Sequence, residues 1–215
     1  MPNVKNNAST QETCRRLIDA AGQVFAERGL HAATVKEITE RAGVNTAAIN
    51  YHFNDKQELY TEVIRHALSQ TPMIREAELG GTPEERLRTF ISEVIADLFD
   101  PERPSWRATV VAHEFIQPTG ALDAVLDDLI RPRAQLLHDL VRELVGDGPD
   151  EFAIACARFS VAAQCFFYLY NRELLKRLSP ELSAPENSAE LAERIADFSL
   201  AGLKALARGD AKSAE

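Results

Sequence analysis

The stretch Thr46–His52 carries small and polar side chains whose chemistry suits the edges of DNA bases. The carboxamide of Asn50 can donate one hydrogen bond to an adenine edge and accept another from it. Thr46 and Ala47 can contact a thymine methyl group, and their small size lets the backbone sit close to the bases. Because no Lys or Arg lies between Val44 and Asp55, this stretch cannot supply the paired hydrogen bonds that recognise guanine.

Two short helical patterns must hold these side chains in place. Thr34, followed three residues later by Glu37, forms a capping box that starts the first helix. Gly43 stands at the turn, a position that often requires positive φ, and Asn45 is a suitable N-cap for the second helix. Apolar residues at helical spacing give the two helices an inner face, with Val35, Ile38 and Ala42 in the first and Ala48, Ile49 and Phe53 in the second. We therefore predict a helix-turn-helix over residues 34–53, whose second helix enters the major groove.

Residues around the motif are placed to contact the sugar-phosphate backbone. Thr34 and Lys36 open the first helix, which crosses that backbone, and Thr34 also has its capping role. Tyr51 and His52 can reach phosphates, although His52 fits equally well as a packing residue. Lys56 lies in the first turn of the next helix, where backbone N–H groups favour a phosphate. The predicted DNA contacts are Thr34, Lys36, Asn45, Thr46, Ala47, Asn50, Tyr51, His52 and Lys56.

The segment AGVNTAAINYHFNDKQELY resembles the signature of the TetR family of transcriptional regulators, in which a short turn leads to a small recognition helix and then to an aromatic cluster. The resemblance covers roughly residues 10 to 65. The recognition helix of the family usually carries Gly, Lys or Arg where this chain has Thr46-Ala47-Ala48, which leaves the operator sequence open. The resemblance implies C-terminal helices that form an effector pocket and a dimer interface.

A second resemblance lies further along the chain. Residues 112–146 are similar to the CecR/CerR-like subgroup of TetR regulators, and the matching positions are Glu114, Pro118, Thr119, Ile130 and Pro132. In that subgroup these positions belong to the ligand-side domain, so the resemblance implies a ligand-binding role for this part of the chain.

Helical patterns fill the chain, so we predict an all-α fold. The helices are expected over residues 10–28 (with a Ser9–Glu12 capping box), 55–69, 82–100 (with a Thr82–Glu85 capping box), 105–117, 119–145, 150–178 and 186–208. Pro132 predicts a kink or a division into two pieces. Residues 71–81 are expected to be a connector and 211–215 a disordered tail. We predict an N-terminal three-helix DNA-binding domain over 1–55 and a helical effector-binding and dimerisation domain over 56–210.

Composition narrows the class of protein. The 215 residues are 45% hydrophobic, enough for a sizeable core, and no run of 18 apolar residues predicts a transmembrane span. The N-terminus lacks an apolar signal-peptide core, so we expect a cytoplasmic protein. Cys14, Cys156 and Cys165 are too few for a disulfide framework, and no spacing predicts a metal site or a cofactor.

The net charge of −9 is unevenly distributed. Residues 1–60 carry seven basic and seven acidic side chains and are neutral, so the whole excess lies in residues 61–215. The neutral part can dock on DNA while the acidic part faces away from it. We expect binding through helix-end contacts, a few cations and dimerisation.

Polar or aromatic residues on otherwise apolar helices are the candidates for effector binding, although such residues are more often plain core. Four of them form a stripe over residues 106–117, and three lie on the helices predicted over 82–100 and 150–178. The candidates are Phe90, Trp106, Val110, His113, Gln117, Phe166 and Tyr168. The last two long helices are apolar on more than one face, which predicts that they also form a dimer interface.

The sequence favours a homodimeric repressor that a small molecule releases from a palindromic operator. One alternative is a thiol-based sensor using Cys156 and Cys165, whose nine-residue spacing places them on opposite sides of one helix. An enzyme is a further alternative, but no nucleophile triad, phosphate-binding loop or metal spacing supports it.

Overall fold

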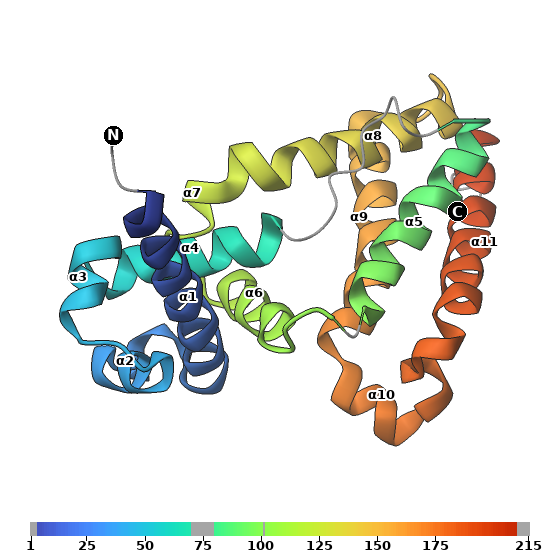
Figure 1. The fold of residues 1–215 in the computed structure, drawn as a ribbon. Helices are drawn as coiled ribbons and strands as arrows, with labels where there is room; N and C mark the ends of the chain where they lie inside the picture. Colours follow the sequence, from blue (N-terminus) through green and yellow to red (C-terminus); the bar gives the residue numbers. More distant parts are fainter. Residues whose placement is uncertain (1–3, 70–79, 101, 210–215) are drawn as a thin grey trace. The chain divides into compact units, whose positions relative to one another are not determined.

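The computed structural model describes residues 4–69, 80–100 and 102–209, and these residues contain helices and no strand. Figure 1 shows the order of the helices along the chain. The chain divides into two compact units. We call Met1–Gln70 with Pro104–Leu129 the head, and Thr71–Arg103 with Ile130–Glu215 the C-terminal unit. This division differs from the predicted one, which placed the boundary after Asp55. The head also includes residues 56–70 and 104–129.

The head is built from the helices of its two chain segments. They are α1 (Val4–Ala32), α2 (Val35–Ala42), α3 (Ala47–Phe53), α4 (Lys56–Ser69), α6 (Trp106–Ile116) and α7 (Asp123–Val125), followed by the π-helical turn η2 (Leu126–Ile130). The prediction that Pro132 divides the 119–145 pattern is confirmed, since the π-helical turn separates α7 from α8.

The first helix is longer than predicted. It begins at Val4, so Ser9 lies inside it and is not its N-cap. A Ser–Glu spacing of three is also tolerated within a helix, and the N-terminal prediction was wrong for that reason. The predicted stop is confirmed in part, because Gly29 has φ 72° and ψ 168° and interrupts the regular helix before its last residues.

The predicted caps of the helix-turn-helix are confirmed in part: Thr34 caps α2 as expected, but Asn45 is not the N-cap of α3. The Thr34 hydroxyl accepts a hydrogen bond from the Glu37 amide at 3.1 Å. Gly43 adopts the left-handed conformation with φ 63° and ends α2. The first residue before α3 is Thr46 rather than Asn45, but the Asn45 side chain accepts from the Ala47 amide at 2.9 Å. The motif over 34–53 therefore folds as predicted.

In the core of the head, α1 packs against α4 of the first segment and α6 of the second. Phe25 and Tyr60 are fully buried and meet edge to face at 5.0 Å between ring centroids. On the same helix, a Cβ atom at Gly22 would lie 2.4 Å from Cδ2 of Trp106, so α6 approaches α1 closely only because residue 22 is glycine. Trp106 is 5% exposed and belongs to the core of the head.

The C-terminal unit contains the remaining helices. They are α5 (Pro83–Phe99), α8 (Arg131–Val145), α9 (Glu151–Tyr170), α10 (Arg172–Leu178), the 3₁₀ turns η3 (Pro180–Ser183) and η4 (Pro185–Asn187), and α11 (Ser188–Ala207). The capping box of Thr82 and Glu85 opens α5 as predicted. The expected connector lies almost wholly outside the described residues, as does the 211–215 tail.

The predicted helix over 150–178 is divided at Asn171. This residue has φ −111° and ψ 24°, and both its backbone and side-chain N–H groups donate to the Phe167 carbonyl. An Asn that bonds its own backbone favours a helix end, which the apolar pattern of the sequence concealed.

Among the described residues, α9 is long and apolar enough to cross a membrane by length and composition, although only 17% of its most apolar window is buried. The sequence analysis searched for an uninterrupted run of 18 apolar residues and therefore did not identify α9 as a candidate span. One such helix is weak evidence for a membrane span, because an apolar helix that packs on another protein meets the same criteria.

Candidate DNA-binding surface and effector region

The recognition helix α3 separates its apolar and polar residues. Ile49 is 0% exposed and Phe53 8% exposed, so the inner face is buried in the head. Thr46, Ala47, Asn50 and Tyr51 are exposed, and Tyr51 retains 79% of its exposure. The Tyr51 ring, which meets His52 edge to face at 4.8 Å between centroids, and the Asn50 amide are therefore exposed to solvent on one short helix.

Thr34 and Lys36, at the start of α2, differ in whether their side chains are available to contact DNA. Thr34 is committed to its capping bond. The Lys36 side chain is 79% exposed, and its Nζ lies 3.8 Å from the Glu40 carboxylate. Exposed pairs of this geometry contribute little, so Lys36 can leave Glu40 for a phosphate at small cost.

His52 packs against the first helix. It is half-buried, and its Nδ1 lies 3.3 Å from the Cys14 thiol. Burial raises the pKa of that thiol above its usual range. Of the two interpretations that the sequence left open for His52, this contact supports packing.

The Lys56 ammonium is hydrogen-bonded to backbone carbonyls within the head. Its ammonium donates to the carbonyls of Leu30 and Ala33, both at 2.8 Å, and to that of His31 at 3.4 Å. All three N–H donors of an ammonium therefore have acceptors within the head.

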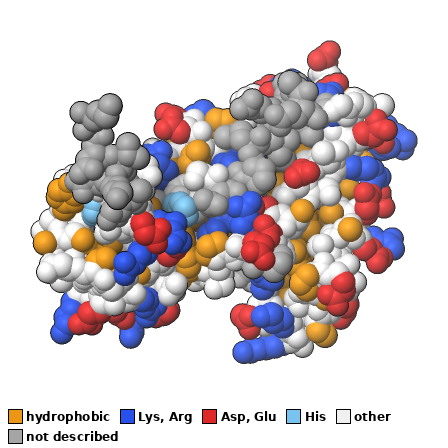
Figure 2. Space-filling model, viewed as in Figure 1, with side chains coloured by type: hydrophobic (Ala, Val, Ile, Leu, Met, Phe, Trp, Pro, Cys, Tyr) orange, Lys and Arg blue, Asp and Glu red, His pale blue; other side chains and the backbone are white. Residues whose placement is uncertain are grey.

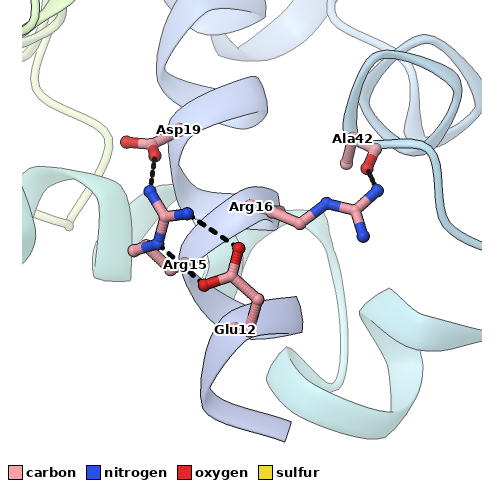
Figure 3. Close-up of polar contacts among 5 residues, drawn as sticks. All are labelled: Glu12, Arg15, Arg16, Asp19 and Ala42. Carbon is pink, nitrogen blue, oxygen red and sulfur yellow. Dashed lines mark hydrogen bonds and ion pairs between the residues drawn. The ribbon is translucent and has the colours of Figure 1, made fainter. Parts of the chain in front are cut away.

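Other cations of the head are also paired. Arg15 bonds Glu12 and Asp19 on α1, as Figure 3 shows. Arg41 bonds Glu27 through two hydrogen bonds of 2.6 and 3.0 Å, and this bond lowers the pKa of the Glu27 carboxyl. On the face drawn in Figure 2, basic side chains lie beside acidic ones over most of the surface rather than in one basic patch. Charge pairing of this kind agrees with the neutral balance of residues 1–60.

Sequence reasoning missed the role of Arg16. Its guanidinium donates to the carbonyl of Gly43 at 3.1 Å and to that of Ala42, at the turn of the motif (Figure 3). Nothing in the local sequence indicates this contact, because the acceptors lie on another helix 26 and 27 residues away.

The predicted effector residues are divided between the two units. On α6, Trp106 and Val110 are buried in the head, whereas His113 and Gln117 are exposed. The C-terminal unit holds the other three candidates. Phe90 is in its apolar core and Tyr168 packs against that core, but Phe166 is 41% exposed.

Glu114 gains a specific role from the structure. Its carboxylate is 0% exposed, and it accepts hydrogen bonds from the Thr119 amide, the Thr119 hydroxyl and the Leu122 amide at 2.9 to 3.0 Å. Burial and this carboxylate together raise the pKa of Tyr60 above its usual range. The sequence singled Glu114 out through the subgroup resemblance, and a carboxylate on an otherwise apolar helix was the signal that could have indicated its buried role.

The C-terminal unit exposes apolar side chains on two neighbouring helices, and we call this set of residues the apolar seam. On α9, Phe152, Phe159 and Phe166 repeat every seven residues and are 79%, 62% and 41% exposed. On α11, Phe198 is 74% exposed, and the Gln164 side chain joins α9 to α11 through Ser199 at 3.1 Å. The seam comprises Phe152, Cys156, Phe159, Ala163, Phe166 and Phe167 of α9 and Phe198, Ala201, Gly202 and Ala205 of α11.

The two cysteines of α9 face opposite sides. Cys156 is exposed and Cys165 is buried, and burial raises the pKa of the Cys165 thiol to about 12. A thiol that is protonated and buried is a poor nucleophile. These positions disfavour a sensor that pairs the two thiols within one chain.

Family comparisons identify the class of protein. Residues 17–63 match the model of bacterial regulatory proteins of the tetR family, and residues 83–203 match the C-terminal domain of the HTH-type transcriptional dual regulator CecR. The chain therefore belongs to the TetR family of transcriptional regulators and carries a CecR-like C-terminal domain, as the sequence resemblance implied.

Individual relatives agree with this assignment. The chain is 29% identical to the regulator SrpR of Pseudomonas putida over 67% of this chain and 66% of SrpR, so the match spans just under two thirds of that relative. It is 27% identical to the repressor NicS of Pseudomonas putida over 87% of this chain and 91% of NicS. It is 35% identical to the activator FasR of Mycolicibacterium smegmatis over 62% of this chain and 66% of FasR.

Solved structures show the same helical fold. The regulator FadR from Bacillus subtilis, in complex with stearoyl-CoA, has a TM-score of 0.67 and 20% identity over 87% of this chain and 98% of FadR. The hemolysin II regulator HlyIIR has a TM-score of 0.65 and 20% identity over 88% of this chain and 97% of HlyIIR. At this identity the likeness concerns the fold alone.

Proposed function

We propose that the chain is a homodimeric repressor that binds a palindromic operator and leaves it when a small molecule binds the C-terminal unit. The observation that carries the proposal is the exposed outer face of α3, where Thr46, Ala47 and Asn50 lie beside Tyr51. None of these side chains supports the core of the head, and their chemistry fits A·T base pairs and phosphates.

Dimerisation supplies the second recognition helix. The apolar seam exposes five phenylalanines on two neighbouring helices, and an apolar surface of this size on a soluble protein marks a binding surface. A second copy related by a two-fold axis would cover the seam with the same surface. Two heads spaced about 34 Å apart would then dock in successive major grooves of a palindromic site.

The effector is proposed to be at least partly apolar. FadR, which shares the fold, was solved with stearoyl-CoA, and Phe90 and Tyr168 of this chain belong to the apolar region of the C-terminal unit. Apolar walls give affinity to such ligands. The effector need only favour a dimer with the wrong head spacing by a few kcal/mol to lower DNA occupancy substantially.

Repression is favoured over activation by the length of the NicS match, which spans 87% of this chain, whereas the match to the activator FasR spans 62%. A regulator of bacterial genes acts where the chromosome is, so we propose a cytoplasmic location.

A footprint on the DNA upstream of its own gene tests the proposal. We expect two protected half-sites of opposite orientation, centred about one helical turn apart, and a particle of dimer mass in light scattering. Deleting the gene should raise expression from the protected promoter. A single protected half-site, a monomer at micromolar concentration or a fall in expression would each contradict the corresponding part of the proposal.

A further inference from the structure

Cations from α4 and α1 bond the backbone on both sides of α2, at the end of α1 and at the turn before α3. At the N-terminal end, Lys56 of α4 donates to the carbonyls of Leu30, His31 and Ala33, directly before the cap residue Thr34. At the C-terminal end, Arg16 of α1 donates to the carbonyls of Ala42 and Gly43. We call these two contacts the entry clamp and the exit clamp.

The entry clamp occupies carbonyls that the chain leaves without regular helical partners. Gly29 interrupts α1 with its non-helical φ and ψ, and the last carbonyls of a helix have no intrahelical donor. The positive charge of Lys56 also lies where the helix dipole is negative. The Leu30 and Ala33 bonds are partly buried, so withdrawing the ammonium would leave two short charge-assisted bonds unmade.

The exit clamp lies at the turn that orients the recognition helix. Gly43 adopts φ 63° there, and a Cβ atom added at this position would lie 2.8 Å from Nη2 of Arg16. The arginine thus closes over the turn between α2 and α3 (Figure 3). Both clamps act on backbone carbonyls, so they fix the path of the chain rather than the rotamer of one side chain.

We propose that Lys56 and Arg16 are positioning residues that set the angle of the helix-turn-helix on the head, and that neither contacts a phosphate in the DNA complex. A phosphate contact would draw each cation away from its carbonyls. The proposal rests on the DNA-binding role of the head, and of the two lysines predicted to contact DNA it assigns a phosphate contact to Lys36 alone.

The salt dependence of DNA binding separates a clamp from a phosphate contact. Each neutralised phosphate steepens the slope of log K against log salt by about 0.9. The probe is a duplex that the wild-type chain selects from a random-sequence library. We expect Lys36→Met to make the slope shallower by about 0.9 per subunit. Lys56→Met should instead lower affinity for the selected duplex about tenfold or more, with its slope unchanged.

Rescue by Lys56→Arg tests the clamp further, because a guanidinium can also donate to carbonyl oxygens. It should recover part of the affinity that Lys56→Met loses. A slope that becomes shallower in Lys56→Met would identify a phosphate contact and overturn the proposal. An unfolding temperature that falls while the affinity of the folded protein stays unchanged would show a merely structural role, and would also overturn it.

Two further measurements cover other outcomes. If Lys56→Met does not fold, Arg16→Met replaces it with the same expectations for affinity and slope. If the wild-type chain selects no duplex, the proposed function fails. Hydrogen exchange then tests the entry clamp independently of DNA binding. The Glu37 amide, which the Thr34 cap protects, should then exchange faster in Lys56→Arg than in wild type and slower than in Lys56→Met; equal protection in all three would overturn the clamp.

Discussion

The head and the C-terminal unit treat their large apolar side chains in different ways. In the head, Ile49 and Phe53 of α3 are buried. Among the described side chains of the head, the exposed large hydrophobic ones are Tyr51 of α3 and Phe115 and Ile116 at the end of α6. The C-terminal unit also has a buried core, yet Phe152, Phe159, Phe166, Phe167 and Phe198 remain 41% to 79% exposed.

This difference indicates which surface needs which partner. The head buries the apolar face of α3 within one chain, and the exposed polar face of this helix suits a polar partner such as DNA. The C-terminal unit leaves phenylalanines in water, and burying each one contributes about 1.5–3 kcal/mol. In the proposed dimer, the stability of this unit would therefore depend on association.

The largest expected effect comes from placing a charge in the seam. Phe159→Asp would bury a carboxylate without a partner at a dimer interface, so we expect monomers in light scattering. Operator affinity should fall by about a hundredfold or more, because two linked heads bind far more tightly than one.

Ile116→Asp provides the matched control for the seam. Ile116 is 75% exposed, as Phe159 is 62% exposed, but it lies on the head. The control should retain the dimer mass. If both variants lost the dimer, or if neither did, the seam would not be the surface on which dimerisation specifically depends.

A smaller effect is expected from the close approach of α1 and α6 in the head. The methyl group of Gly22→Ala would meet the ring of Trp106, and overpacking of this kind costs about 1–3 kcal/mol. Thermal unfolding followed by the fluorescence of Trp106, the single tryptophan of the chain, measures the loss. In a Trp106→Leu background the same substitution should cost clearly less; an equal cost in both backgrounds would show that the ring is not the obstacle.

Sequence reasoning found what local signals determine. The caps at Thr34 and Thr82 and the turn at Gly43 depend on residues three or fewer positions apart, and the structure confirms them. The predicted start of the first helix at residue 10 and the undivided helix over 150–178 were wrong, because Ser and Asn occur inside helices as well as at their ends.

Contacts between distant segments could not be predicted in this way. Lys56 lies 23 to 26 residues from its acceptors, and its place at a helix start suggested a phosphate instead. Trp106 was predicted to line an effector pocket, since nothing in the sequence shows that the chain returns to the head after α5. By contrast, the exposed face of α3 follows from helical periodicity alone, which is why Asn50 and Tyr51 were placed correctly on the surface.

Asn50 tests the polar face of the head. If its amide reads a base edge, Asn50→Ala should cost about 1–3 kcal/mol on the selected duplex and little on random DNA. Gel shifts on both duplexes measure the ratio. Thr61→Ala is the control, since Thr61 lies on α4 and its hydroxyl donates to the Gln57 carbonyl; equal losses on both duplexes for Asn50→Ala would assign it to the sugar-phosphate backbone.

The smallest expected effect is a pH dependence that belongs to the head. His66 stacks on Trp106 at 6.3 Å between ring centroids. Burial lowers the pKa of His66, Asp19 raises it in part and Arg107 lowers it further. The folded head therefore holds His66 neutral, while the unfolded chain takes up a proton below a pKa of about 6.5.

The sign of the effect follows from that proton. The stability that a neutral His66 contributes is fully present above about pH 6.5 and is lost as the pH falls from there towards the lowered pKa of the folded state. We expect the unfolding temperature reported by Trp106 fluorescence to fall between pH 7 and pH 5, and to fall less in His66→Gln. His31→Gln, at an exposed position of α1, should follow the wild-type profile. If His66→Gln and wild type lose stability in parallel over this range, the carboxylates of the chain cause the loss and His66 does not.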